Sequence, residues 1–68
     1  MDNRVNHKAP KGKFRVVTFD SFDNYEAIDG DFDTLQAARA KAKNIGGVMI
    51  IAYVHDDNGA IIDRFGSY

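Results

Sequence analysis

Residues 33–47, "DTLQAARAKAKNIGG", decide the fold because they predict one helix in the middle of a strand-rich chain. Asp33 is a favoured N-cap residue, and Gln36 stands three places on, where its side chain can reach back to the cap amide. Four alanines give the segment a high helix propensity. Gly46 or Gly47 then supplies the left-handed residue that ends the helix. The apolar positions recur with helical spacing, at Leu35, Ala38, Ala42 and Ile45.

The segment before the helix predicts a β-hairpin. Residues 13–22, "KFRVVTFDSF", carry β-branched and aromatic residues on both alternating sets, as a central strand does. Residues 25–32, "YEAIDGDF", alternate less cleanly and carry more charge, which is typical of an edge strand. Asp23 and Asn24 lie between them and suit a turn, because such side chains bond their own backbone and tolerate left-handed geometry.

A second hairpin follows the helix. Residues 48–56, "VMIIAYVHD", are apolar on both faces and predict another central strand. Asn58 and Gly59 are a strong hairpin signal, since both accept the positive φ of a type I′ turn. Residues 60–68, "AIIDRFGSY", predict the return strand, and its charged pair of residues marks it as an edge.

The element order is therefore β-β-α-β-β, and the fold class is α+β. If the second strand leads through the helix into the third, these two strands run parallel, with a right-handed crossover. Placing the first strand between them gives a four-stranded, mainly antiparallel sheet of order 2-1-3-4, with the helix packed on one face. This order puts the two doubly apolar strands in the centre and the two charged strands at the edges.

Composition and charge divide the chain into a tail and one small domain. The 68 residues contain no cysteine, which excludes disulfides, Cys-ligated metals and thiol catalysis. Residues 1–15 carry five cations against one acid, whereas residues 16–68 carry four cations against nine acids. Residues 1–12 lack an apolar period, so we expect a disordered basic tail, and residues 13–68 form the single α+β domain. No apolar run is long enough to span a membrane or forms a signal peptide, so we expect no membrane partner and a cytoplasmic location.

The acidic stretch 20–34, "DSFDNYEAIDGDFDT", is a candidate cation site. A calcium loop beginning at Asp29 would need Gly at its sixth position and Glu at its twelfth, but Thr34 and Ala40 stand there. We therefore expect structural roles for its acids: a turn at Asp23, a bend or bulge at Asp29 beside Gly30, and the helix cap at Asp33.

The two histidines predict no catalytic or metal centre. His7 lies in the tail, and His55 stands at a strand end with no partnered nucleophile visible. We expect a solvated strand-end histidine at His55. The sequence thus predicts no catalytic, cofactor-binding or metal-ligating residues and a non-enzymatic protein. An enzyme using the acidic edge or His55 would need a concave pocket beside those side chains.

One surface is left over by this architecture. A single helix covers one face of the sheet, yet both central strands carry apolar residues on both faces. An exposed apolar face of this size is typical of an interaction surface. We therefore expect a small binding or regulatory module that forms a homodimer or binds a protein partner through the open sheet face. The predicted interface residues are Val17, Phe19, Met49, Ile51 and Tyr53.

Two other interpretations of that surface stay open. The N-terminal tail or the C-terminal "RFGSY" (64–68) could fold over the second face and remove the need for a partner. The alternative function is nucleic-acid binding, in which the basic tail contacts phosphates and exposed sheet aromatics stack on bases. Against it, residues 16–68 carry a net negative charge, which repels a polyanion.

The segments "GDFDTLQAARAKAKNIGG" (30–47) and "YVHDDNGAIIDRFG" (53–66) resemble the small bacterial β-β-α-β-β domains of unknown function. In those domains a Thr-led helix follows a hairpin and a Gly-containing turn opens the last strand. The resemblance implies the same fold and a bacterial source. It transfers no catalytic residue to this chain.

Overall fold

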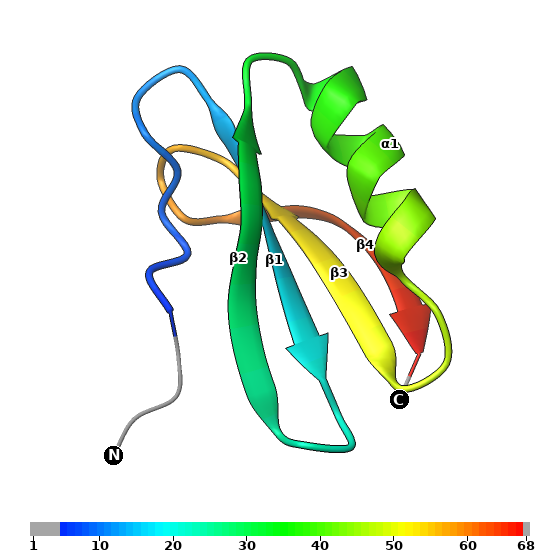
Figure 1. The fold of residues 1–68 in the computed structure, drawn as a ribbon. Coiled ribbons are helices and arrows are strands. Elements are labelled where there is room, and N and C mark those ends of the chain that lie inside the picture. The colour runs from blue at the N-terminus through cyan, green and yellow to red at the C-terminus, as the bar shows by residue number, and fades with distance from the viewer. Residues whose placement is uncertain (1–4, 68) are drawn as a thin grey trace.

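The computed structural model describes residues 5–67 and has the β-β-α-β-β order that the sequence predicts. One helix packs on a four-stranded sheet (Figure 1). The elements are β1 (Phe14–Asp20), β2 (Tyr25–Phe32), α1 (Leu35–Ile45), β3 (Ile50–His55) and β4 (Ile61–Ser67). Within residues 5–67, no helix combines the length and apolar character that crossing a membrane requires.

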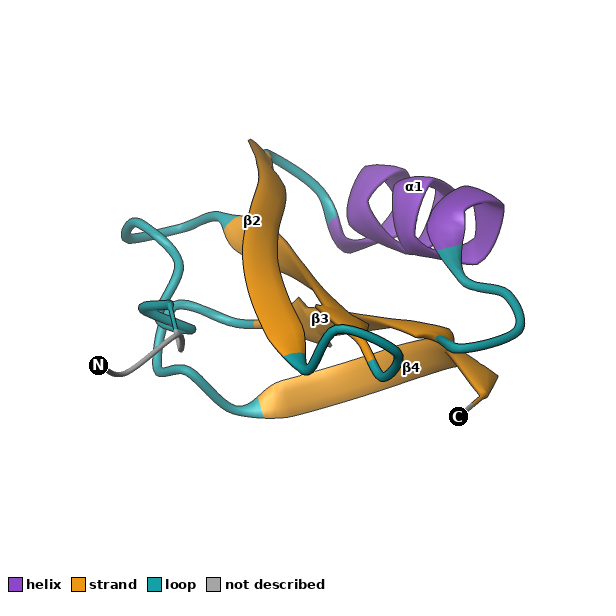
Figure 2. Ribbon diagram, turned by 60° about the horizontal axis from the view of Figure 1, so that its bottom comes forward, coloured by secondary structure: helices purple, strands orange, loops and turns teal. Residues whose placement is uncertain are grey.

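The strand order is β2-β1-β3-β4, which confirms the predicted topology. All three neighbouring pairs are antiparallel. The sheet is strongly twisted, so that β2 and β4 run in very different directions and α1 lies on one side of the sheet (Figure 2). The chain between residue 5 and β1 lies on the other side, away from α1 (Figure 1).

The main core lies between α1 and the two central strands. Ala38 and Ala42 of the helix are fully buried against Val16 of β1 and against Ala52 and Val54 of β3. Small helix residues let the backbones approach closely, and larger apolar side chains close the rim of this core. Those partly buried residues are Phe14, Phe32, Leu35, Ile45 and Phe65.

Both ends of the helix differ from the sequence prediction. The N-cap is Thr34, whose side-chain oxygen accepts a hydrogen bond of 3.1 Å from the Ala37 amide. The prediction of Asp33 as the cap is wrong, because its carboxylate is exposed and forms an ion pair with Lys13. At the other end, Gly46 has φ −59° and ψ 138°, and Gly47 has no positive φ either, so the left-handed stop expected at one of them is also wrong.

Gly46 has no unusual backbone angle. A glycine is needed there because the helix end packs closely against β4. A Cβ atom there would lie 2.6 Å from the carbonyl oxygen of Phe65 on β4. Gly47 has open space at the same place, with no atom within 4 Å. The first of the two glycines therefore lets the end of the helix approach the edge strand.

The turns follow the sequence in part. Asn24 adopts left-handed geometry (φ 54°) in the first turn, as predicted, and Asp29 forms the predicted bulge in β2, between Gly30 paired with Val16 and Ile28 paired with Val17. The type I′ turn prediction is wrong. Only Gly59 of the second turn has positive φ (85°), and its amide donates to the Asp56 carbonyl at 3.1 Å.

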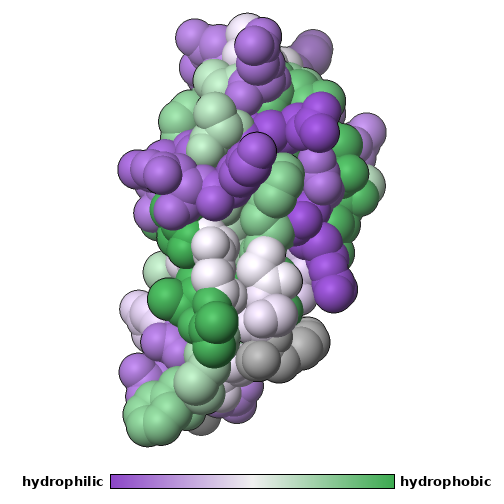
Figure 3. All heavy atoms as spheres, turned by 90° about the vertical axis from the view of Figure 1, so that its right-hand side faces the viewer, coloured by the Kyte–Doolittle hydropathy of each residue, from purple (hydrophilic) through white to green (hydrophobic). Residues whose placement is uncertain are grey.

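Seen from the side of α1, hydrophilic side chains cover the upper part of the molecule, and hydrophobic side chains reach the surface toward its lower end (Figure 3). The β1–β2 turn and the chain between α1 and β3 lie at that end in Figure 1. Phe22 is 77% exposed and Val48 is 82% exposed. This end is therefore a second apolar surface, separate from the sheet face considered below.

Candidate functional site

The rear face is the side of the sheet opposite α1. Directly paired residues of antiparallel strands point to the same side, so the register fixes which side chains lie together. The paired residues of this face form rows, each with one residue from β2, β1, β3 and β4 in that order. The rows are Asp31–Arg15–His55–Ile61, then Ile28–Val17–Tyr53–Arg64, then Glu26–Phe19–Ile51–Gly66.

Four of the five predicted interface residues lie on this rear face, but only two of them reach its surface. Val17 and Ile51 are fully buried within the chain. Phe19 and Tyr53 are half-buried. A partner can therefore contact Phe19 and Tyr53, whereas Val17 and Ile51 belong to the interior.

Met49 lies elsewhere, because β3 begins one residue after it. Gly47 and Ile50 pair with each other, and Val48 and Met49 form the turn between them. Met49 has φ 67°, an unusual conformation for a residue with a side chain, and it is 39% exposed. The sequence placed Met49 inside the strand because the apolar run has no break at this position.

The chain from Val5 to Ala9, here called the strap, crosses the rear face. The sequence analysis expects a disordered basic tail over residues 1–12 and leaves open that the tail folds over this face; in the structure residues 5–9 lie on it. Residues 1–4 of that prediction lie outside the described residues. The strap is held mostly by polar contacts and buries only the small side chain of Ala9, so the sequence shows no apolar period there. The polar contacts run from Val5 N to Glu26 Oε1 (3.2 Å), from Arg15 Nη1 to Asn6 O (2.9 Å) and from Ala9 N to Asp56 O (3.1 Å).

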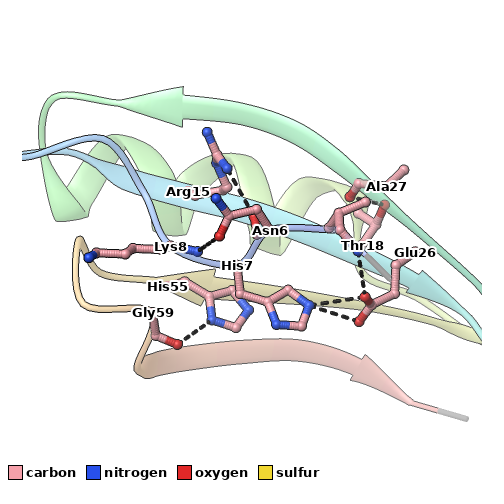
Figure 4. A network of polar contacts seen from close by, with 10 residues as sticks. Asn6, His7, Lys8, Arg15, Thr18, Glu26, Ala27, His55 and Gly59 are labelled. Atoms are coloured by element: carbon pink, nitrogen blue, oxygen red, sulfur yellow. Dashed lines mark hydrogen bonds and ion pairs between the residues drawn. The ribbon is translucent and has the colours of Figure 1, made fainter. Parts of the chain in front are cut away.

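Two histidine rings meet where the strap crosses β3 (Figure 4). His7 stacks on His55 with ring centroids 4.7 Å apart and an angle of 5° between the planes. His7 Nε2 also donates to both carboxylate oxygens of Glu26, at 3.0 and 3.1 Å. The strap is thus bound to two strands of the sheet, β2 and β3, through one side chain.

His55 is buried, with 3% of its surface exposed, so the expected solvated histidine is wrong. Its Nδ1–H donates to the Gly59 carbonyl at 3.1 Å, and this bond fixes the ring. Burial lowers the pKa of His55 below its ordinary value, because the charged ring would lose its hydration. The hydrogen bond to Gly59 and the nearby Glu26 carboxylate oppose this change.

A shallow cavity of about 290 Å³ opens beside the two rings. Its walls combine aromatic and aliphatic surface with the carboxylate of Glu26. The lining residues are His7, Phe19, Glu26, Tyr53, His55 and Ile61. Such a cavity suits an apolar or planar side chain, with a polar group placed toward the carboxylate. Over residues 5–67, no three His, Asp or Glu side chains gather in an arrangement that could hold a metal ion.

Much of the positive charge of the folded part is neutralised within the chain. Arg15 donates to both carboxylate oxygens of Asp31, at 2.7 and 3.1 Å, and this bond lowers the pKa of Asp31. Arg39 pairs with Asp63 of β4 at 2.8 Å. Other ion pairs join Lys13 to Asp33 and Lys41 to Asp29. Three of these four pairs use carboxylates of the acidic stretch 20–34, namely Asp29, Asp31 and Asp33, as structural partners.

Comparison of the chain with protein-family models, with curated proteins and with solved structures finds no match. The resemblance to small bacterial domains of unknown function therefore stays a prediction. The rear face, its strap and its cavity are the features from which a function can be argued.

Proposed function

We propose that this protein is a small non-catalytic binding module that associates with a second copy of itself through the uncovered part of the rear face. The observation that carries this proposal is the exposure of large apolar residues at both edges of that face. Ile61 on β4 is 58% exposed and lines the cavity, and Ile28 on β2 is 43% exposed. Phe19 and Tyr53 lie half-buried between these edges.

The size of the core favours a second copy as the occupant. Four of the eight buried apolar residues within residues 5–67 are alanines, which contribute little apolar area each. A chain of 68 residues buries a small share of its surface on folding, and no cysteine is present to add a disulfide. Association of two rear faces would bury the exposed parts of Ile28 and Ile61 and so add apolar area to a small core.

The alternative proposal, binding of a nucleic acid, has weaker support. Phosphate contacts need available cations, and those of Lys13, Arg15, Arg39 and Lys41 are paired with carboxylates of the same chain. His7 and Tyr53 do provide ring surface beside the cavity. Salt-sensitive binding of a mixed-sequence oligonucleotide would favour this alternative.

The oligomeric state of the full chain at neutral pH tests the proposal, measured by sedimentation equilibrium over micromolar to millimolar concentrations. We expect a dimer for the wild-type protein. Ile61→Lys places a charge at the edge of the rear face and should shift the protein to monomer. Val48→Lys is the matched control, because Val48 is equally apolar and 82% exposed but lies in the turn before β3, and it should leave the dimer intact.

Two results would contradict the proposal. A wild-type monomer over the whole concentration range would exclude self-association. A dimer that survives Ile61→Lys but dissociates with Val48→Lys would move the interface to the apolar end of the molecule. Circular dichroism of both variants shows whether each retains the fold.

A further inference from the structure

The strap is attached to the rear face by contacts of a kind that can be released without unfolding the domain. Its anchors are the polar bonds at Val5, Asn6 and Ala9, the stacked ring of His7 and one small buried apolar side chain, the methyl group of Ala9. The helix-side core, by contrast, contains only apolar side chains. Loss of the strap therefore leaves the main core intact.

The chain between the strap and β1 has the features of a hinge. Gly12 has φ 78°, and its amide donates to Asp57 Oδ2 at 2.9 Å. The Lys13 amide donates to the Pro10 carbonyl at 2.9 Å, which closes a turn just before β1. Rotation at Gly12 can move the strap while β1 keeps its place in the sheet.

The two stacked rings are the titratable contact between strap and sheet. His55 is faced by His7 from the strap, by Glu26 from β2 and by Arg15, its direct partner on β1. Arg15 is bound to Asp31, and the partner of His55 on β4 is the apolar Ile61. On β3 itself, the ring centroid of Tyr53 lies 6.2 Å from that of His55, and Asp56 is the next residue after His55 in the chain.

We propose that residues 5–9 are a pH-sensitive strap, which leaves the rear face when His7 and His55 both carry a proton. A protonated His7 alone is compatible with the strap, since its Nε2–H bonds the Glu26 carboxylate. A proton on His55 as well puts two positive rings face to face at 4.7 Å, with the His55 ring almost completely shielded from water. Glu26 can offset one of these charges but not both.

The direction of the pH effect follows from the His55 ring. Its pKa in the strapped state lies below 6.5, with burial as the largest cause, whereas release of the strap hydrates the ring and brings the pKa back toward 6.5. The released state therefore binds the proton more readily. The strap is fully favoured above pH 6.5 and is weakened as the pH falls from 6.5 through the lowered pKa of the strapped state.

Release of the strap changes the cavity, because His7 is one of its walls. Acid would convert a walled cavity into a wider apolar face. The consequence for binding rests on the proposed function. The release itself does not, and the experiment below measures it on the single chain whether or not a dimer forms.

Amide hydrogen exchange of the full chain, followed by NMR from about pH 7.5 to about pH 5, tests the strap. The probe is the Ala9 amide, which donates to the Asp56 carbonyl, and the reference is the Gly46 amide, which donates to Ala42 at the end of the helix. We expect the protection factor of Ala9 to be lost below pH 6.5 while that of Gly46 is retained. Equal protection of Ala9 across the range, or simultaneous loss at both amides, would overturn the proposal.

His7→Phe is the decisive variant. A Phe ring can stack on His55 without titrating, and it attracts a protonated His55 through its face. The variant lacks the bond to Glu26, so its strap is bound more weakly at every pH. The quantity to compare is therefore the change of Ala9 protection with pH, and its absolute value is not compared. We expect the fall of Ala9 protection below pH 6.5 to be smaller in His7→Phe than in the wild type, because the variant removes the repulsion between two charged rings and keeps the burial of His55. An equal fall of Ala9 protection in the variant and in the wild type would overturn the proposal. If the wild-type protein shows the expected exchange pattern but is a monomer, only the proposed self-association is rejected.

Discussion

The two faces of the sheet are covered by different physical means. On one face, α1 buries Ala38 and Ala42 against Val16, Ala52 and Val54, with no charged side chain in the cluster. On the other, a short strap is attached by main-chain hydrogen bonds, two imidazole rings and the small buried side chain of Ala9. Burial of apolar area does not depend on protonation, whereas stacked histidines do. The same sheet therefore has one permanent covering and one that can respond to pH.

The largest expected effect tests how closely the helix face is packed. Gly46→Ala places a methyl group 2.6 Å from the Phe65 carbonyl, so the end of α1 must move away from β4. We expect a loss of about 3 kcal/mol in the free energy of unfolding, measured by urea denaturation at neutral pH. Gly47→Ala is the matched control with open space around it, and it should change the stability by less than about 0.5 kcal/mol. Equal effects of the two substitutions would contradict the close approach.

A second pair of substitutions compares the two faces directly. Val54→Ala removes fully buried side-chain atoms on the helix face and should lower the free energy of unfolding by roughly 2 kcal/mol. Ile61→Ala removes more atoms on the rear face, but that side chain is 58% exposed, so we expect a loss below about 0.5 kcal/mol for the monomer. Denaturation at low protein concentration separates this value from any effect on association. A larger loss for Ile61→Ala would mean that the Ile61 side chain itself is part of the monomer core.

The smallest effect concerns the start of the helix. Thr34→Ala removes the hydroxyl that accepts from the Ala37 amide and should cost about 1 kcal/mol. Asp33→Ala should leave the free energy of unfolding close to that of the wild type, because the ion pair of Asp33 with Lys13 is exposed to solvent and contributes little. Thermal unfolding followed by circular dichroism measures both. The reverse order of the two effects would restore Asp33 as the cap.

Local sequence signals predicted the elements and their order. Two doubly apolar segments became the central strands, and the charged segments became the edges. The bulge at Asp29 and the left-handed Asn24 were also predictable, because Gly, Asp and Asn have strong local preferences in turns. Each of these features depends on residues that are neighbours in the chain.

The candidate site was harder to predict from the sequence. The apolar run at residues 48–54 gave no sign that Met49 would leave the strand, because the break comes from the pairing of Gly47 with Ile50. The His7–His55 contact joins residues 48 positions apart, and His7 lies in a segment of polar composition. Histidine in both halves of the chain was the only signal, and spacing alone could not bring the two rings together.

The sequence by itself determined the layers of this protein, since the periods of apolar residues set which segments become strands, which becomes the helix and which face each presents. Only the tertiary structure decided what lies on the second face. The strap, the burial of Val17 and Ile51 and the cavity beside His55 depend on contacts between distant segments. The physical reason is that hydrophobic periodicity is a local property of the chain. Ring stacking and main-chain hydrogen bonds are set by the three-dimensional approach of groups that carry no pattern in the sequence.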